Sequence, residues 1–192
     1  MLKRTLLLVL FFAFTVAAQV TTTKPYPIDN NHSTVGFSVP IFGGLSQVTG
    51  KFTDFNITLL NDEKDITKSS VSVVIKTASV NTGIEGRDKH LRTADFFDVE
   101  KFPEITFKSE RIEKKGKQFI ALGPLTMHGV TKQISLPFTI TGTLKNPLTV
   151  GYSAKMVLNR RDYGINYTRK DNPSFVGDNI TVAIDLVTKA VK

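Results

Sequence analysis

Apolar and polar residues alternate along most of the chain, in segments that turn residues separate. Successive side chains of a β-strand point to opposite faces, so each such segment predicts a strand with one buried face. The pattern is most regular at residues 130–140, where valine, isoleucine, leucine and phenylalanine alternate mainly with polar residues. The segments with this alternation are 34–41, 47–60, 70–80, 104–112, 117–126, 130–140, 148–158 and 179–186.

One of these segments changes its apolar side midway. Val48 and Phe52 lie on one face, whereas the apolar residues of 55–59 lie on the other. One extra residue in a strand produces such a change of phase, so we expect a β-bulge near Thr53 and Asp54.

The spacing of the segments predicts the fold class. Short strands separated by turn residues favour an antiparallel barrel or sandwich. Several segments reach about ten residues, and long strands favour a barrel with an elongated interior. We therefore predict an all-β, extended barrel of eight antiparallel strands with a short helical insertion near residues 84–97. A barrel of this size is either filled by side chains or holds one small ligand. The turn residues are Asn61-Asp62, Lys115-Gly116, Gly142, Asn146-Pro147 and Gly177-Asp178.

The same alternation predicts which side chains line the interior. One face of each strand points inward, and that face is mostly apolar here, so a ligand held inside should be apolar too. The predicted wall consists of Phe37, Val39, Val73, Ile75, Phe107, Phe119, Leu136, Phe138, Tyr152, Ala154 and Met156.

Residues 84–97 break the β pattern with charged residues at helical spacing. We expect a helix over residues 85–93, with Ile84 and Leu91 facing the protein body. That orientation draws Arg87 or Asp88 partly inward, and a charge near an apolar surface is tolerated only when it is paired.

Two further features of this segment suggest its role. Asp88 and Arg92 are spaced i,i+4, so they can pair on the helix surface. Phe96 and Phe97 follow, and they are predicted to cover one edge or mouth of the interior. The segment is then an anchored connection between strands, a lid over a cavity or, least favoured, a catalytic centre.

Composition narrows the function classes. The chain has no cysteine, which excludes thiol catalysis, iron–sulfur clusters and cysteine-ligated zinc. Its formal net charge is +8, but the basic residues are scattered, with short clusters only at Lys114-Lys115 and Arg160-Arg161. Nucleic acid is therefore not an expected partner. Attraction to an anionic headgroup or to a membrane surface fits the charge better, as does solubility alone.

The first residues have the form of a secretory signal peptide. Lys3 and Arg4 form a basic start, an apolar run follows at residues 6–14, and small residues precede Gln19. We expect cleavage after Ala18, which divides the chain into a signal peptide at 1–18 and one domain at 19–192. The run is short for a permanent membrane anchor, so the mature protein is expected in the periplasm or secreted.

Catalytic and metal-binding patterns are absent from the sequence. The three histidines, His32, His90 and His128, lie in different segments, and none has a second histidine at metal-ligand spacing. No nucleophile elbow, H-E-x-x-H motif or phosphate loop occurs. We therefore predict no catalytic residue, no metal site and no cofactor.

The residues also carry a resemblance, which covers nearly all of the expected mature chain. The chain resembles the YceI-like family of exported polyisoprenoid-binding proteins, whose fold is an extended lipocalin-like barrel. The motifs that carry it are IDNNHSTVGFSV (28–39), VTGKF (48–52), GRDKHLRTADFFDVEKFPEITFKS (86–109), LGPLTMHGVTKQISLPF (122–138), LNRRDYGI (158–165) and VGDNITVAIDL (176–186). One departure is visible: the family often has a histidine soon after the first F-S-V, where this chain has Pro40 and Ile41.

The resemblance implies a ligand with a long isoprenoid tail in a tunnel through the barrel, such as a polyprenyl phosphate or a quinone. Arg160 or Arg161 could meet an anionic headgroup there, since guanidinium matches phosphate geometry. The alternative is an ion pair with Asp162 or another carboxylate. The candidates for the mouth or for headgroup contact are Arg87, Asp88, Phe96, Phe97, His128 and Arg160.

Three functions remain open at this point. The first is a binding protein for an isoprenoid lipid, with transient contact to a membrane. The second is a ligand-free structural or stress protein of the cell envelope, which would have a filled interior. The third is an enzyme acting on such a lipid, which needs His90 or His128 beside a carboxylate inside the cavity. The sequence leaves the oligomeric state open, a homodimer included.

Overall fold

Residues 23–190 are described by the computed structural model, so the expected signal peptide lies outside the described residues. The described chain forms one antiparallel sheet of twelve strands. The strands are β1 (Lys24–Pro27), β2 (Thr34–Ile41), β3 (Ser46–Phe52), β4 (Phe55–Asn61), β5 (Ser70–Lys76), β6 (Val80–Asn81), β7 (Glu104–Lys108), β8 (Arg111–Lys115), β9 (Gln118–Met127), β10 (Val130–Lys145), β11 (Leu148–Asn159) and β12 (Asn179–Val187).

Within residues 23–190, helical structure is confined to short pieces. The α-helix α1 spans Glu85–Leu91. Four 3₁₀ segments complete the set: η1 (Phe42–Gly44), η2 (Ile66–Lys68), η3 (Thr77–Ser79) and η4 (Arg160–Tyr163).

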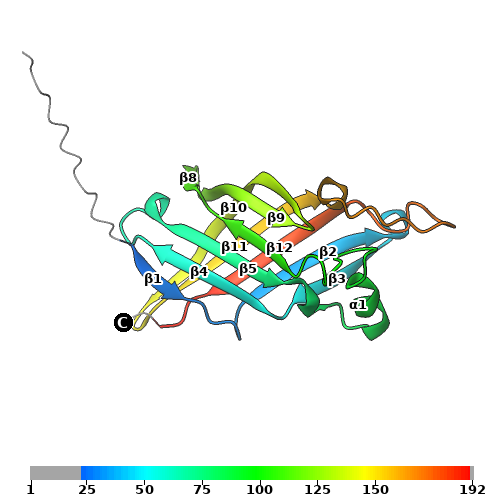
Figure 1. The fold of residues 1–192 in the computed structure, drawn as a ribbon. Coiled ribbons are helices and arrows are strands. Elements are labelled where there is room, and N and C mark those ends of the chain that lie inside the picture. Colours follow the sequence, from blue (N-terminus) through cyan, green and yellow to red (C-terminus); the bar gives the residue numbers. More distant parts are fainter. Residues whose placement is uncertain (1–22, 191–192) are drawn as a thin grey trace, which may run out of the picture.

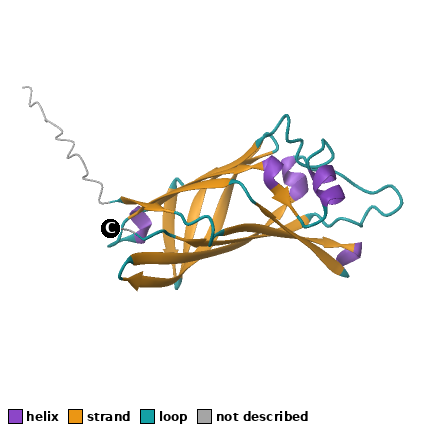
Figure 2. Ribbon diagram, turned by 90° about the horizontal axis from the view of Figure 1, so that it is seen from below, coloured by secondary structure: helices purple, strands orange, loops and turns teal. Residues whose placement is uncertain are grey.

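The sheet curls strongly on itself into a lipocalin-like barrel (Figures 1 and 2). Its strand order is β1-β4-β5-β7-β9-β10-β11-β12-β2-β3-β6, with β8 beside β9. Two segments of the chain bend, so that each supplies one strand to either edge of the curled sheet. β4 continues β3 along the chain, and β6 continues β5, so that β3 and β6 pair with each other at Lys51–Asn81 and Phe52–Val80.

The two ends of the barrel differ. α1 and the loop of residues 164–178 lie at one end, and β1 and the β10–β11 hairpin lie at the other (Figure 1). We call these the helix end and the hairpin end. The interior between them holds a continuous cluster of buried apolar side chains, among them Tyr26, Val35 and Ile105.

The predicted fold class is confirmed, but the predicted number of strands is wrong. Residues 47–60 divide at Thr53 and Asp54, where the change of phase predicted a bulge. Residues 70–80 are interrupted by η3, and residues 104–112 are interrupted at Ser109-Glu110. β1 has only four residues, too few to show an alternating pattern.

One predicted turn lies inside a strand. Gly142 belongs to β10, where the pairing with β11 shifts register between Ile140 and Gly142. The turn follows later, at Asn146-Pro147, between β10 and β11.

The predicted helix exists, although its packing differs from the expectation. α1 ends at Leu91 rather than at residue 93. Ile84 is 55% exposed, so the prediction that it packs against the protein body is wrong: it immediately precedes the helix and points to solvent. Leu91 packs against the core, and Asp88 is buried.

Candidate functional site

The barrel encloses an open cavity at its helix end. The cavity has a volume of about 430 Å³, within the range of small-molecule sites in proteins. Its walls are almost entirely apolar and come from eight strands, from α1 and the residues that follow it, and from the loop of residues 164–178. The open cavity favours a binding protein over a ligand-free structural protein, because the barrel of a ligand-free structural protein would be filled by its own side chains.

The predicted wall residues divide between two cavities. Those that line the cavity at the helix end are Phe37, Val39, Val73, Ile75, Phe107, Leu136 and Met156. Phe119 and Tyr152 line a second, more polar cavity of about 430 Å³ at the hairpin end. Phe138 and Ala154 line neither, and their positions lie between the two along β10 and β11.

The first strand is apolar where the family often has a histidine. Val39 and Ile41 both line the cavity, and Ile41 also bridges Val176 of the loop of residues 164–178, which we call the mouth loop. Pro40 faces the same loop, and its carbonyl oxygen accepts a hydrogen bond from Gly177 N at 2.8 Å. The departure from the family pattern thus makes this part of the cavity wall more apolar.

Aromatic side chains gather where α1 meets the mouth loop. His90 contacts the rings of Phe96 and Tyr167 edge to face, each at 5.1 Å between ring centroids. Phe96 and Tyr167 lie 4.8 Å apart, and Phe97 packs edge to face on Phe52 of β3. All these rings except Phe52 belong to segments outside the sheet, so together they form a cover of the cavity. We call His90, Phe96, Phe97 and Tyr167 the aromatic cover.

The charged groups on the cavity wall are cationic. Arg87, Arg160 and Arg169 line it together with His90, and within residues 23–190 no aspartate or glutamate does. An arginine-lined opening of an apolar cavity suits an anionic group attached to an apolar tail, because guanidinium groups form charge-assisted hydrogen bonds to phosphate oxygens.

Arg87 is held without a carboxylate partner. Its Nε donates to Thr82 Oγ1 at 2.7 Å, and its Nη2 donates to Thr82 O at 3.1 Å. The Asp88 carboxylate accepts from the same threonine, from N at 2.9 Å and from Oγ1 at 2.5 Å. Thr82 therefore stands between the two charges, and no described carboxylate forms an ion pair with Arg87. Its charge remains available to a ligand.

Asp88 and Arg92 do not form the helix-surface pair that their spacing suggested. Asp88 is buried and directed toward Thr82. Arg92 donates instead to two carbonyl oxygens that precede the helix, Ala78 O at 2.7 Å and Val80 O at 2.8 Å. Both charges thus fix α1 to the end of η3 and to β6.

Arg160 is committed to the mouth loop. Its buried guanidinium donates to three carbonyl oxygens of residues 165–177 and forms an ion pair with Asp178 at 2.8 Å. Burial lowers the pKa of Arg160, and Asp178 opposes that shift. Arg161 shares Asp178, whereas Asp162 pairs with Lys132. Arg160 is thus an anchor of the loop, and its partner is Asp178 rather than Asp162.

Neither candidate histidine forms an enclosed acid–base pair. His90 Nε2 lies 2.7 Å from Asp95 Oδ2, but both side chains are about half exposed at the cavity edge. His128 lines neither cavity. Its Nδ1 lies 3.1 Å from Tyr163 O, an acceptor only, so Nδ1 carries the proton. Nε2 is then a buried acceptor with no hydrogen-bond partner among the described residues.

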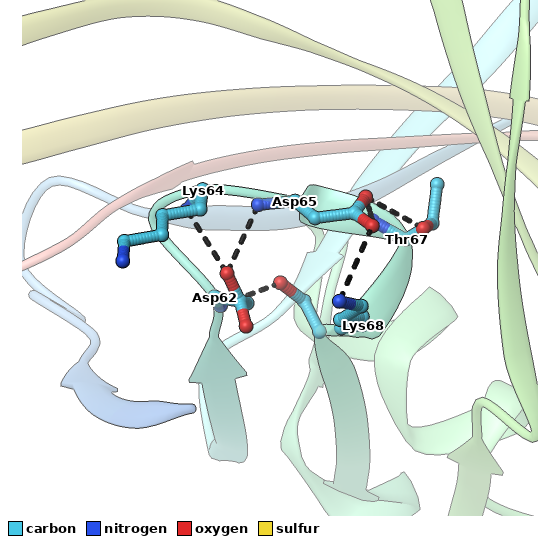
Figure 3. Close-up of polar contacts among 6 residues, drawn as sticks. Asp62, Lys64, Asp65, Thr67 and Lys68 are labelled. Atoms are coloured by element: carbon cyan, nitrogen blue, oxygen red, sulfur yellow. Dashed lines mark hydrogen bonds and ion pairs between the residues drawn. The ribbon is translucent and has the colours of Figure 1, made fainter. Parts of the chain in front are cut away.

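The second cavity is closed on one side by a hydrogen-bonded loop. In this loop, Asp62 Oδ1 accepts from the backbone N–H groups of Lys64 and Asp65, each at 2.9 Å (Figure 3). Asp65 in turn caps η2 by accepting from Thr67 N and Oγ1, and these hydrogen bonds lower the pKa of its carboxyl group. The loop is thus rigidly held over the hairpin end.

Part of the cavity wall was not predicted. Tyr167, Arg169, Phe175 and Val176 belong to the mouth loop of residues 164–178, which has no alternating pattern. In the structure its rings make close contacts: Arg169 lies over Phe175 at 4.8 Å, and Phe175 packs on Phe42 at 4.6 Å. Aromatic residues inside an otherwise polar loop could have pointed to this role.

Two other kinds of site are absent from the described residues. Residues 23–190 contain no group of three or more histidine, aspartate or glutamate side chains placed to hold a metal ion. Among the helices of the same residues, none has the length and apolar character needed to cross a bilayer.

The fold and the cavity define a lipocalin-like barrel with an apolar interior, and comparisons with known proteins give its family. The YceI-like domain matches residues 26–188. Protein YceI of Escherichia coli O157:H7 is 34% identical over 169 residues, covering 85% of this chain and 88% of that protein. The chain therefore belongs to the YceI-like family.

Solved structures agree with this assignment. The crystal structure of the Campylobacter jejuni YceI protein is 30% identical, with a TM-score of 0.67 over 76% of this chain and 86% of that one. A polyisoprenoid-binding domain from Saccharophagus degradans, implicated in plant cell wall breakdown, shares the fold. It is 16% identical, with a TM-score of 0.60, over 86% of this chain and 98% of that one.

Proposed function

We propose that the protein is an exported binding protein that holds a long isoprenoid lipid, with the tail in the cavity at the helix end. The observation that carries this proposal is the open apolar cavity inside the barrel. Family membership supports it, as does the polyisoprenoid-binding domain that shares the fold. Export follows from the expected signal peptide at residues 1–18.

The charge of the cavity wall favours one class of headgroup. Arg87, Arg160 and Arg169 line the cavity without a carboxylate among the described lining residues. A polyprenyl phosphate would therefore find a cationic group at the end of an apolar path, whereas a neutral quinone would not use these charges. Arg87 is the best placed of the three, because Arg160 and Arg169 already pair with Asp178 and Asp171.

An enzyme acting on such a lipid is the second candidate, and one observation bears on it. His90 lines the cavity and contacts Asp95 at 2.7 Å. A general base needs a position beside the reacting atoms, but this pair lies at the solvent edge and takes part in the aromatic cover. We therefore assign it a structural role.

Delivery of a lipid requires contact with a membrane, and the helix end offers a surface for it. The tip between β2 and β3, residues 42–45, exposes two apolar side chains: Phe42 is 50% exposed and Leu45 is 91% exposed. We call these residues the β2–β3 tip. Phe42 contacts Phe175 of the mouth loop, so this tip adjoins the cavity opening. An apolar tip in a cationic protein suits the interface of an anionic bilayer.

Extraction tests the proposal. The mature protein would be purified without detergent, extracted with organic solvent and analysed by mass spectrometry, and we expect a polyprenyl phosphate at near-stoichiometric amounts. Arg87→Ala should lose most of this lipid, whereas Arg161→Ala, a surface arginine outside the cavity wall, should keep it. Recovery of no lipid, together with no binding of any added polyprenyl phosphate, short or long, would contradict the proposal.

A further inference from the structure

Three neighbouring strands contribute to both cavities, and they reveal what separates them. On β10, Leu136 lines the cavity at the helix end and Ile140 lines the one at the hairpin end. On β11, Met156 and Tyr152 take the same two positions. Residues two apart on a strand share a face, so the residues between these pairs, Phe138 and Ala154, also point inward.

The strand pairing brings these intermediate residues together. Phe138 lies opposite Ala154 of β11 on one side and opposite Phe119 of β9 on the other. On β9 the corresponding inward positions between the cavities are Ala121 and Gly123. The intermediate positions of β9 and β11 therefore carry only alanine and glycine. On these three strands, Phe138 has the largest side chain at the positions between the cavities.

The ring contacts of Phe138 fix its place. It stacks on Phe119 at 5.5 Å between centroids with an interplanar angle of 28°. It also contacts Tyr152, tilted at 6.4 Å. Phe119 and Tyr152 both line the cavity at the hairpin end, so the Phe138 ring lies directly behind two of that cavity's wall residues. We call Phe119, Phe138 and Tyr152 the aromatic partition.

We propose that Phe138 sets the maximum length of the lipid tail. This inference rests on the proposed function. A tail that enters between the arginines at the helix end runs along Leu136 and Met156 and stops at the Phe138 ring. A longer tail would have to displace that ring from its stack on Phe119 or bend back within about 430 Å³. Because the residues beside Phe138 on β9 and β11 are small, its ring is the main obstacle that these three strands place between the two cavities.

The test compares tails of graded length. Wild-type protein and Phe138→Ala would be delipidated and titrated with farnesyl, geranylgeranyl and longer polyprenyl phosphates up to undecaprenyl phosphate, with binding followed by native mass spectrometry. We expect a sharp loss of wild-type affinity beyond one tail length. Phe138→Ala should bind the first excluded tail about tenfold more tightly, a difference of about 1.4 kcal/mol, and should bind the short tails as wild type does.

Two further variants control for folding and for a general loss of packing. Phe138→Trp should move the limit to shorter tails, and it decides the matter if Phe138→Ala does not fold. Phe55→Ala removes the same side chain from a buried site that lines neither cavity. It should lower the melting temperature and leave the length limit unchanged.

The outcomes separate this inference from the function on which it rests. An unchanged length limit in folded Phe138→Ala and Phe138→Trp overturns the role of Phe138 and leaves lipid binding intact. A limit that moves equally in Phe55→Ala also overturns it, because general loosening would then be the cause. Failure of the wild-type protein to bind any polyprenyl phosphate contradicts the proposed function itself.

Discussion

At the helix end, Thr82 holds two charged side chains in place. Its hydroxyl and backbone groups bind both Asp88 and Arg87, so one threonine fixes the start of α1 and directs a guanidinium toward the cavity. The sequence placed these residues together in one motif. It could not show that Thr82, which directly follows β6, is their common partner, because that contact depends on how the helix folds back on the strand that precedes it.

Asp88→Asn tests this anchor. The buried carboxylate accepts two hydrogen bonds from Thr82, and hydrogen bonds to a charged group contribute about 1.5–3 kcal/mol each. An amide keeps the shape but loses the charge, so we expect thermal unfolding, followed by circular dichroism, to show a loss of about 1–2 kcal/mol. Retained lipid should fall with it. Asp95→Asn, at an exposed site on the same segment, is the matched control and should change stability little.

A different result would point to catalysis. If Asp88→Asn kept its full stability while a measurable reaction on an isoprenoid substrate disappeared, the aspartate would be a catalytic group and not an anchor.

Ionisation of Tyr152 is expected to lower the stability of the folded protein at alkaline pH. Burial raises the pKa of its hydroxyl, which donates to Asn61 Oδ1 at 3.3 Å, above the ordinary value of about 10. The unfolded chain therefore releases this proton at lower pH than the folded protein does. The stabilising contribution is complete below about pH 10 and is lost as the pH rises beyond it.

Tyr152→Phe should remove part of that loss. Urea unfolding between neutral pH and about pH 11 should show a flatter decline for the variant than for wild type, because one hydroxyl that resists ionisation is absent. At neutral pH the variant should be weaker by about 0.5–1.5 kcal/mol from the missing hydrogen bond. Parallel alkaline declines in the two proteins would refute this role.

At the scale of elements, alternation predicted strands well and interruptions poorly. β2 begins and ends where its pattern does. The change of phase at Thr53 and Asp54 marks the boundary between β3 and β4, not a bulge within one strand. The breaks at η3 and at Ser109-Glu110 also coincide with a change of phase, from Ile75 to Val80 and from Phe107 to Ile112, although each segment was predicted as one strand. They depend on which neighbour a strand pairs with, since β7 and β8 pair with different parts of β9.

The same limit applies to the site. An inward apolar residue has the same sequence pattern whether it touches another side chain or empty space. Alternation therefore placed Phe107 and Phe119 on one wall, but it could not show that they face different cavities. The mouth loop of residues 164–178 was missed because loops have no period.

Gly123 allows β9 to change partners, and Gly123→Ala tests this. A methyl group at this position would lie 2.0 Å from Lys108 O, at the end of β7. Such a backbone clash cannot be relieved by a side-chain rotation, so we expect a loss of about 1–3 kcal/mol in chemical unfolding. Gly142→Ala is the matched control, since a methyl group there meets nothing within 4 Å. Equal stability of the two variants would contradict the argument.

At the scale of the molecule, the barrel has two unlike ends. The helix end combines the cavity opening, three arginines and the exposed β2–β3 tip, whereas the loop of residues 62–68 covers one side of the more polar cavity at the hairpin end. The tip is held in an unfavourable backbone conformation: Phe42 has a φ of 53°, which bulky residues rarely adopt. Hydrogen bonds from Phe42 N to Phe175 O and from Gly43 N to Ser174 O tie it to the mouth loop.

This arrangement predicts that the protein exchanges lipid with a membrane through its helix end. Leu45 is 91% exposed at the tip and Leu144 is 67% exposed on the β10–β11 hairpin at the other end, so Leu45→Glu and Leu144→Glu form a matched pair. Burying a leucine contributes about 1.5–3 kcal/mol. We expect Leu45→Glu to slow transfer to vesicles containing anionic lipid roughly tenfold for a polyprenyl phosphate that the wild-type protein binds, while Leu144→Glu transfers at the wild-type rate. Added salt should slow wild-type transfer as well, because it screens the attraction of the cationic protein to the vesicle. Equal slowing by both variants would instead mean that docking has no preferred end, and the link between the tip and the cavity mouth would fail.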